Sequence, residues 1–347
     1  MSAKRILIVD TVATKAYDGT SLQGSGLGGT EATVIKVAES LTKYYKVFVA
    51  QSARNQITLH KGVVYMDFDH KHVPNHLLVD VVINVRAHKI LPRIRRAFPK
   101  SQMYLWMHCN PGKRLKNLGQ TCIETNTTLV GVSQYHANIL HKYCLRYSGG
   151  QRLPRITYHY NPVSAYRQTV IRKNPYKLIN MSSPHKGLAE VIKHFKYCRQ
   201  HIPELELYIA NPGYLNWQVG QDGEGIVSLG SLPQRDLHHH LQESLCLFYP
   251  QTSFAETFGL VYAEAQALST PVLCSDIGSA SEIVAESGGY VLRDTSSEKV
   301  LETLKSWLAN GAPKPKAQRQ FHISQVTLAW RKDIERKHEV FDKASNA

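Results

Sequence analysis

No run of apolar residues in this chain is long enough to cross a bilayer, and the first residues, MSAKRILIVD, lead straight into an expected strand instead of a secretory signal pattern. Cysteine is scarce, with six residues and no C-x-x-C pair. Several of the cysteines lie in apolar segments, so we interpret them as reduced, buried side chains of a cytosolic protein. They are Cys109, Cys122, Cys144, Cys198, Cys246 and Cys274.

Acidic residues are few in the first half of the chain. Residues 1–173 contain 25 Lys and Arg against 8 Asp and Glu, whereas residues 174–347 contain 17 against 19. A basic first half implies an anionic partner, which could be a membrane surface, a nucleic acid or a charged glycan. The length of 347 residues allows two domains of ordinary size.

Two short apolar strands alternate with two helices in the most informative stretch of the sequence. The expected bounds are 245–249 and 271–275 for the strands, 257–268 for the first helix, and 281 or 282 for the start of the second. The first turn of the first helix leaves the N–H groups of Phe258, Gly259 and Leu260 free. These donors and the positive end of the helix dipole form a site for an anion, most naturally a diphosphate.

The same stretch resembles the retaining glycosyltransferases of the GT-B fold, in particular glycosyltransferase family 4. The matching residues are Glu256-Thr257-Phe258-Gly259-Leu260, Glu264-Ala265, Pro271-Val272 and Gly278-Ser279-Ala280-Ser281-Glu282. Two glutamates at this spacing would by themselves also suit an amphipathic helix between buried strands. The whole string in this order is much more specific, and the resemblance extends over nearly the whole chain.

The resemblance and the alternation of strands and helices in both halves imply one α/β architecture. It is the GT-B fold, in which two Rossmann-like, doubly wound parallel-sheet domains face each other across a cleft. We expect an acceptor-binding domain over residues 1–161 and a nucleotide-sugar-binding domain over residues 162–317. A last helix, at about residues 318–345, would pack back on the first domain. Asn161-Pro162-Val163 resembles the hinge of the family.

The family's functional positions can be matched one by one. The resemblance implies catalytic roles for Glu256, Lys186 and His108, with Glu256 on the sugar hydroxyls, Lys186 on the diphosphate and His108 on the donor sugar. Glu264 would bind the ribose. The remaining donor-binding positions are Gly28, Gly29, Ser183, Lys186, Ser231, Leu232, Phe258, Gly259 and Leu260. The family's phosphate-binding arginine is missing, because Ser182 or Ser183 occupies its position.

The resemblance implies that the enzyme uses no metal ion or cofactor. Asp67-Phe68-Asp69 follows an apolar segment and has the Asp-x-Asp pattern that holds a metal in GT-A glycosyltransferases, so it is the alternative that competes with the GT-B interpretation. The histidines at 70, 72, 76 and 238–240 do not show metal-ligand spacing, and we expect them on the surface.

Residues 88–116 interleave basic and apolar side chains. This pattern is typical of a surface that binds an anionic leaflet, and equally of a solvated helix with one face in the core. We predict a retaining, metal-independent enzyme of the cytoplasm or the inner membrane face. It would move a hexose, from a UDP-sugar, to a glycan or lipid-linked acceptor. The alternatives are a GT-B glucosyltransferase of nucleic acid, which we consider the weaker interpretation, and a non-catalytic sugar-nucleotide-binding protein.

Overall fold

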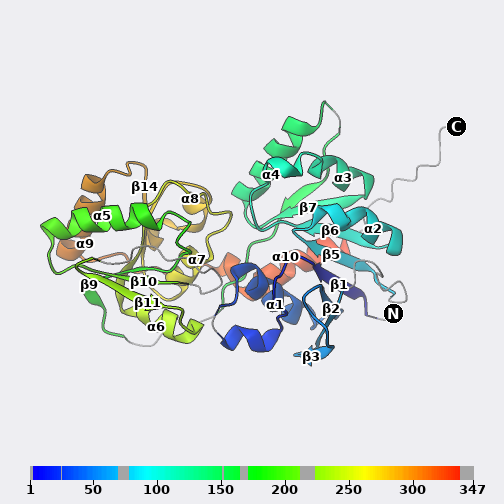
Figure 1. Cartoon of the computed structure of the whole chain (residues 1–347), viewed down its shortest axis with the longest axis horizontal. Coiled ribbons are helices and arrows are strands. Elements are labelled where there is room, and N and C mark those ends of the chain that lie inside the picture. The colour runs from blue at the N-terminus through cyan, green and yellow to red at the C-terminus, as the bar shows by residue number, and fades with distance from the viewer. Residues whose placement is uncertain are drawn as a thin grey trace.

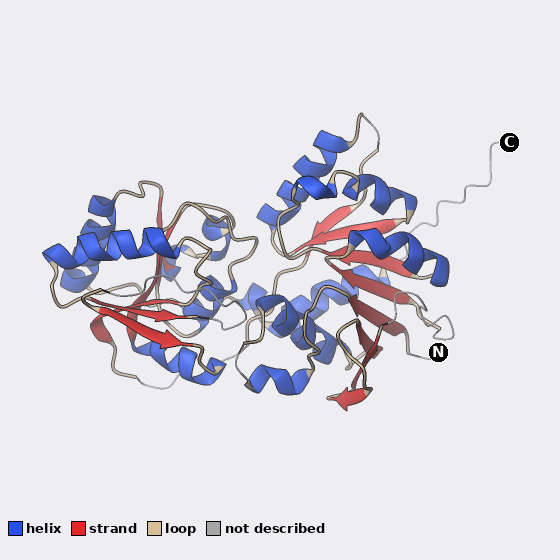
Figure 2. Ribbon diagram, viewed as in Figure 1, coloured by secondary structure: helices blue, strands red, loops and turns tan. Residues whose placement is uncertain are grey.

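The computed structural model describes residues 3–24, 26–68, 78–150, 152–164, 171–211 and 223–336. These residues form two domains, each built on a sheet with helices on both of its faces (Figure 1; Figure 2). The first sheet has the strand order β3-β4-β2-β1-β5-β6-β7-β8, and only the pairing of β3 with β4 is antiparallel. The second is wholly parallel and has the order β11-β10-β9-β12-β13-β14.

The strands of the first sheet are β1 (Arg5–Asp10), β2 (Lys46–Gln51), β3 (Thr58–His60), β4 (Val63–Asp67), β5 (Val81–Val85), β6 (Gln102–Trp106), β7 (Thr127–Gly131) and β8 (Ile156–Tyr158). Those of the second are β9 (Asn174–Asn180), β10 (Glu206–Ala210), β11 (Ile226–Gly230), β12 (Ser244–Tyr249), β13 (Val272–Ser275) and β14 (Gly289–Leu292). In each sheet the chain adds strands first toward one edge and then toward the other. The point where it switches lies between β1 and β5 in the first sheet and between β9 and β12 in the second. Loops at such a point form the ligand-binding crevice of an open α/β sheet.

The α-helices are α1 (Gly29–Leu41), α2 (Leu91–Ala97), α3 (Leu118–Glu124), α4 (Gln134–Tyr147), α5 (Leu188–His201), α6 (Gln234–Glu243), α7 (Leu260–Ala267), α8 (Ala280–Ile283), α9 (Ser297–Asn310) and α10 (Ile323–Glu335). Single 3-10 turns occur at η1 (Gly19–Gln23), η2 (His88–Ile90), η3 (Lys113–Leu115), η4 (Glu286–Gly288) and η5 (Arg319–Phe321).

Strand β1 shows why the sheets are buried on both faces. Ile6 and Ile8 belong to the hydrophobic cluster that includes α1 and α10, whereas Leu7 and Val9 belong to the cluster under α2, α3 and α4. Successive side chains of a strand point to opposite faces, so a continuous apolar run such as RILIV can fill two cores at once. This is the sequence signature of a parallel strand covered by helices.

Two segments connect the domains, and they lie side by side. Val163 forms a parallel bridge with His322, and its N–H donates to the carbonyl oxygen of Phe321 at 2.8 Å. Beyond this point α10 returns to the N-terminal domain (Figure 1), where Trp330 is fully buried between Trp106 and His159. The first and last parts of the chain are thereby joined in one core.

The expected secondary structure differs from the structure at a few boundaries. The short strands β3 and β8 were not predicted, because three residues are too few to show a period. The last helix begins at Ile323 and not at about residue 318, because Arg319–Phe321 form the separate 3-10 helix η5. Residues 337–347 lie outside the described part of the chain.

Candidate active site

The side chains of Lys186 and Glu256 meet at the carboxyl-terminal edge of the second sheet. Lys186 lies in the loop after β9 and Glu256 in the loop after β12, and these two strands are hydrogen-bonded neighbours. The Lys186 Nζ atom is 2.9 Å from Oε1 of Glu256 and 3.2 Å from Oε2. It also lies 4.7 Å from the centre of the Phe254 ring. The Glu256 residue is 7% exposed, so the ion pair is largely screened from solvent.

Two helices begin beside this ion pair. Helix α5 has Gly187 as its N-cap and α7 has Gly259, and each glycine has a positive φ, of 87° and 73°. At Gly259 a Cβ atom would lie 2.4 Å from Cδ2 of Tyr262, so a larger residue would be strained as well as crowded. The positive ends of both helix dipoles therefore point to the loops that carry Lys186 and Glu256.

The expected start of the central helix is wrong by three residues. Helix α7 begins at Leu260 and not near Thr257, because the left-handed backbone of Gly259 interrupts any helix before it. Its first-turn N–H groups are consequently those of Leu260 and Val261, while the N–H of Tyr262 already donates to the Gly259 carbonyl at 3.0 Å. Phe258 precedes the helix, and its ring is buried.

A small polar network holds Glu256 in place. The hydroxyl group of Tyr249 lies 3.4 Å from Oε1 of Glu256 and 3.0 Å from the carbonyl oxygen of Lys186, and it accepts a hydrogen bond from Ser182 Oγ at 3.1 Å. Burial and the nearby charge of Glu256 raise the pKa of Tyr249, which keeps the phenol protonated. Ser182 and Ser183, at the position of the missing arginine, are both buried. The Ser182 hydroxyl is thus already engaged with protein.

Glu264 lies in the second turn of α7 and is 9% exposed. Its Oε1 accepts a hydrogen bond from Nε2 of Gln234 at 3.4 Å. Gln234 is the first residue of α6 and directly follows the loop that contains Ser231 and Leu232. The structure therefore brings these three predicted donor-binding positions to one place. Gln234 was missed, because a single glutamine at a helix start has no distinctive sequence pattern.

His108 approaches the same loops from the N-terminal domain. Its carbonyl oxygen accepts a hydrogen bond from Thr257 Oγ1 at 2.8 Å, next to Glu256 in the sequence. The imidazole packs on Trp106, with 4.6 Å between ring centres, and its buried Nε2 atom has no hydrogen-bond partner among the described residues. Burial, then the positive charge of Arg86, lowers the pKa of His108 well below its usual value. The ring is therefore neutral at physiological pH and available for a hydrogen bond.

The glycine loop of the N-terminal domain reaches the start of α7. A Cβ atom on Gly29 would lie 2.9 Å from Cδ1 of Leu260, and one on Gly28 would lie 2.2 Å from Oε2 of Glu31. Only residues without side chains let the loop come so near to the other domain and to the following carboxylate. Gly28 and Gly29 thus lie close to the first-turn N–H groups of α7.

Further contacts hold the two domains together around the site. Ser133 Oγ donates to the carbonyl oxygen of Thr257 at 2.5 Å. The carboxylate of Glu282 accepts the backbone N–H groups of Gln134 at 2.8 Å and of Tyr135 at 2.7 Å, so a side chain of the second domain caps helix α4 of the first. The sequence motif contained Glu282, but nothing in it indicated a partner more than 140 residues away.

The structure corrects two details of the expected surface. Cys109 is exposed and not buried, because it lies in the loop beyond β6; the other five cysteines are buried as predicted. His238 is buried on the inner face of α6, near Glu264, and not on the surface. Cys109 lies in a loop, whereas His238 lies in the middle of α6 on the face that also buries Leu241.

Neither metal binding nor membrane spanning has support in the described residues. They contain no group of three or more His, Cys, Asp or Glu side chains that could hold a metal ion. Asp67 ends β4 and is exposed, whereas Asp69 and the histidines at 70, 72 and 76 lie outside the described residues. None of the helices in the part of the chain that the structure covers is both long and apolar enough to cross a bilayer.

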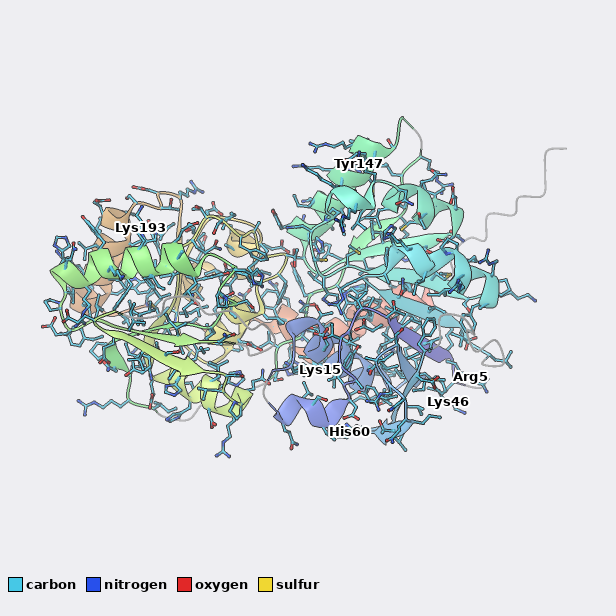
Figure 3. The ribbon with its side chains drawn as sticks, viewed as in Figure 1. Arg5, Lys15, Lys46, His60, Tyr147 and Lys193 are labelled. Atoms are coloured by element: carbon cyan, nitrogen blue, oxygen red, sulfur yellow. The ribbon has the colours of Figure 1, made fainter. Side chains whose placement is uncertain are left out.

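The basic stretch 88–116 has its apolar side chains in the core. Leu91, Ile94 and Phe98 are buried under α2, and the guanidinium of Arg95 donates to the carbonyl oxygens of Thr125, Pro99 and Ser101. Lys116 follows η3, and its ammonium lies 5.8 Å from the ring centre of Tyr147 at the end of α4, which Figure 3 labels. No large apolar side chain of this stretch is fully exposed, so its outer face presents mainly charge.

Residues 167–323 match the family model described as glycosyl transferases group 1. No curated relative matches the chain by sequence. The fold is similar to that of HepE from Anabaena, solved in complex with UDP and glucose, with 15% identity, a TM-score of 0.66, and coverage of 95% of this chain and 99% of that one. It is similar to AviGT4, a glycosyltransferase involved in avilamycin A biosynthesis, with 16% identity, a TM-score of 0.64 and coverage of 95% and 97%. It is also similar to sucrose-phosphate synthase from Thermosynechococcus elongatus, with 12% identity, a TM-score of 0.67, and coverage of 95% of this chain and 98% of that one. The predicted GT-B fold is thereby confirmed.

Proposed function

We propose a donor, an acceptor and a role for each site residue on the premise that this chain is a glycosyltransferase, with a glycosyl transferases group 1 domain in a GT-B fold. That family transfers sugars with retention of the anomeric configuration. We infer that the donor is a UDP-hexose, bound mainly to the second domain. The observation that carries the proposal is the Lys186–Glu256 pair between the N-termini of α5 and α7. The similar fold of HepE, which binds UDP and glucose, supports the choice of donor.

The chemistry needs charge stabilisation more than it needs a protein nucleophile. As the acceptor oxygen bonds to the anomeric carbon, the bond from that carbon to the diphosphate breaks, and the departing phosphate oxygen takes the acceptor proton. Negative charge grows on the diphosphate, where Lys186 and the N–H groups of Leu260 and Val261 meet it. Glu256 accepts hydrogen bonds from the sugar hydroxyls. The neutral imidazole of His108 contributes a further hydrogen bond from the opposite domain, and the two domains hold the substrates at reacting distance.

The role of Glu264 can be tested by nucleotide binding. We propose that its carboxylate accepts hydrogen bonds from the ribose hydroxyls, and a hydrogen bond to a charged group contributes about 1.5–3 kcal/mol. Glu264→Ala should therefore raise the Kd for UDP about 10- to 100-fold. A thermal-shift and calorimetry panel of UDP, GDP, ADP and CMP should show UDP as the strongest ligand of the unaltered protein.

A matched control is Glu302→Ala, because Glu302 is an exposed glutamate of the same domain that pairs with Lys299 on the surface of α9. Its UDP affinity should equal that of the unaltered protein. An unchanged Kd in Glu264→Ala would remove the ribose role, and a preference for another nucleotide would replace UDP as the donor carrier.

We propose that transfer needs no metal ion, since Lys186 and two helix N-termini already provide positive charge for the diphosphate. The expected result is full activity in an excess of EDTA, measured as UDP release from UDP-glucose. A strict requirement for Mn²⁺, restored after EDTA treatment only by that ion, would favour the Asp67/Asp69 interpretation instead.

We propose a glycan or lipid-linked acceptor and a location at the cytoplasmic face of a membrane. The positive charges of residues 88–116 support contact with an anionic leaflet. Because the apolar side chains of this stretch are in the core, such contact would be electrostatic and would weaken as salt concentration rises.

A further inference from the structure

A half-buried arginine and two carboxylates lie together on the N-terminal domain, outside the site positions that the sequence predicted. Arg86 follows β5, Asp10 ends β1 and Glu31 lies in the first turn of α1. One guanidinium nitrogen of Arg86, Nη2, is 3.1 Å from Oε1 of Glu31 and 3.4 Å from each carboxylate oxygen of Asp10. We call these three residues the carboxylate–arginine cluster. The sequence signal was a charged residue at the end of each of two neighbouring buried strands.

The two carboxylates of the cluster differ in their remaining capacity to accept hydrogen bonds. Asp10 is completely buried, and its oxygens also accept the N–H groups of Val12 and Ala13 and the hydroxyl of Tyr17. Its carboxylate oxygens therefore already accept hydrogen bonds from within the fold. Glu31 retains an 18% exposed side chain and its Oε2 faces the glycine loop at Gly28. It is the carboxylate of the cluster that can accept hydrogen bonds from a ligand.

Arg86 has a donor to spare. Its Nε atom is buried and has no hydrogen-bond partner among the described residues, although its Nη2 is paired with both carboxylates. Burial opposes its charge, but the two carboxylates outweigh burial and raise the pKa of Arg86. The guanidinium is thus permanently charged, fixed in position and incompletely satisfied. A buried unsatisfied donor costs stability unless a ligand completes it.

Segments on either side of the cluster contact the loops of the proposed donor site. Arg86 is near enough to His108 for its charge to depress the pKa of that imidazole, and His108 contacts the loop of Glu256 through Thr257. On the other side Glu31 adjoins Gly28, and the next residue, Gly29, contacts Leu260 at the start of α7. One border of the cluster therefore contacts the loop before α7, and the other contacts the first residue of α7.

We propose that the carboxylate–arginine cluster is the acceptor subsite, and that it accepts an uncharged sugar ring and rejects a phosphorylated one. Two carboxylates against one guanidinium give the cluster a formal charge of −1, which repels a phosphate. Neighbouring hydroxyl groups of a sugar can donate to Glu31 and accept from Nε of Arg86. This proposal rests on the proposed function and specifies its acceptor. The excess of Lys and Arg in residues 1–173 lies outside the cluster. It would attract an acceptor whose anionic group is separate from the sugar ring that enters the cluster.

The test measures UDP release from UDP-glucose with two sets of acceptors that share their rings: methyl glycosides and the corresponding sugar phosphates. We expect the methyl glycosides to accelerate UDP release above the rate of donor hydrolysis, with kcat/KM at least about 10-fold above that of any phosphate of the same ring. Glu31→Gln should lower kcat/KM for the methyl glycosides about 10- to 100-fold and narrow the discrimination against phosphates. The Kd for UDP should not change.

Glu39→Gln is the matched control, since Glu39 lies on the same helix but pairs with His60 and Lys61. It should leave the acceptor preference unchanged. If sugar phosphates are preferred, if no methyl glycoside accelerates UDP release, or if Glu31→Gln weakens UDP binding and stability along with transfer, the cluster is not a neutral acceptor subsite. Failure of the unaltered protein to bind any nucleotide would be a different result, because it would refute the proposed donor site itself.

Discussion

Replacing Lys186 with alanine is expected to lower kcat about 100- to 1000-fold, the effect of removing one group that stabilises charge in a transition state. Lys186 Nζ touches both oxygens of Glu256 and lies between two helix N-termini, so it is positioned to meet a leaving diphosphate. At the position of the family's arginine the chain has buried serines, which leaves Lys186 a larger share of this task. The measurement is UDP release under saturating UDP-glucose.

Two further variants test whether the effect of Lys186→Ala comes from the loss of this particular charge. Lys193→Ala removes an exposed lysine of the helix that follows, labelled in Figure 3, and should retain normal kcat. Glu256→Gln retains Lys186 and removes the charge of its partner, so it should impair transfer while stability changes little. If Lys186→Ala loses stability but retains kcat, the ion pair serves the fold and another group must stabilise the diphosphate.

Much of the fold could be predicted because its strands are short, continuously apolar and separated by amphipathic helices. The apolar run RILIVD predicts a strand over residues 5–10, and the segment after Gly187 predicts a helix over residues 188–201. Strand β1 and helix α5 have these bounds. The local pattern was also sufficient to predict that Lys186 and Glu256 meet at one site, since each follows a buried strand and the resemblance implies a role for both. Where a glycine takes a left-handed backbone, as Gly259 does, composition alone misplaced the helix start.

The missing parts of the site depend on contacts between residues distant in sequence. The pairing of Arg86 with Glu31 spans 55 positions, and that of Glu282 with α4 spans more than 140. No periodicity encodes such a pair, because either partner alone is an ordinary charged residue. The apolar residues of 88–116 show a pattern that fits a membrane-binding face and a core-facing face equally. The burial of Leu91 and Ile94 in the structure shows that these residues face the core.

The largest effect on stability is expected at Trp330, the residue that anchors α10 in the first domain. Its indole is fully buried, with ring centres 5.1 Å from Trp106, 5.7 Å from Tyr104 and 4.3 Å from His159. Truncation of a buried tryptophan to alanine costs about 3–5 kcal/mol through lost contacts and the remaining cavity. For a domain of this size Trp330→Ala should lower the first unfolding transition by roughly 6–20 °C in calorimetry.

The same substitution should also reach the active site, because Trp106 packs on one side against Trp330 and on the other against His108. Loosening Trp106 removes the packing that supports the imidazole of His108, so kcat should fall at temperatures where the protein is folded. The Kd for UDP should not change, because we propose that the second domain binds the nucleotide. Leu328→Ala is the control, since Leu328 lies on the same helix and is 40% exposed; its stability should change by no more than about 0.5 kcal/mol. Equal transition temperatures for the two variants would show that α10 is not packed into the first domain, and an equal fall in UDP affinity and kcat would show that the two domains do not divide the reaction as proposed.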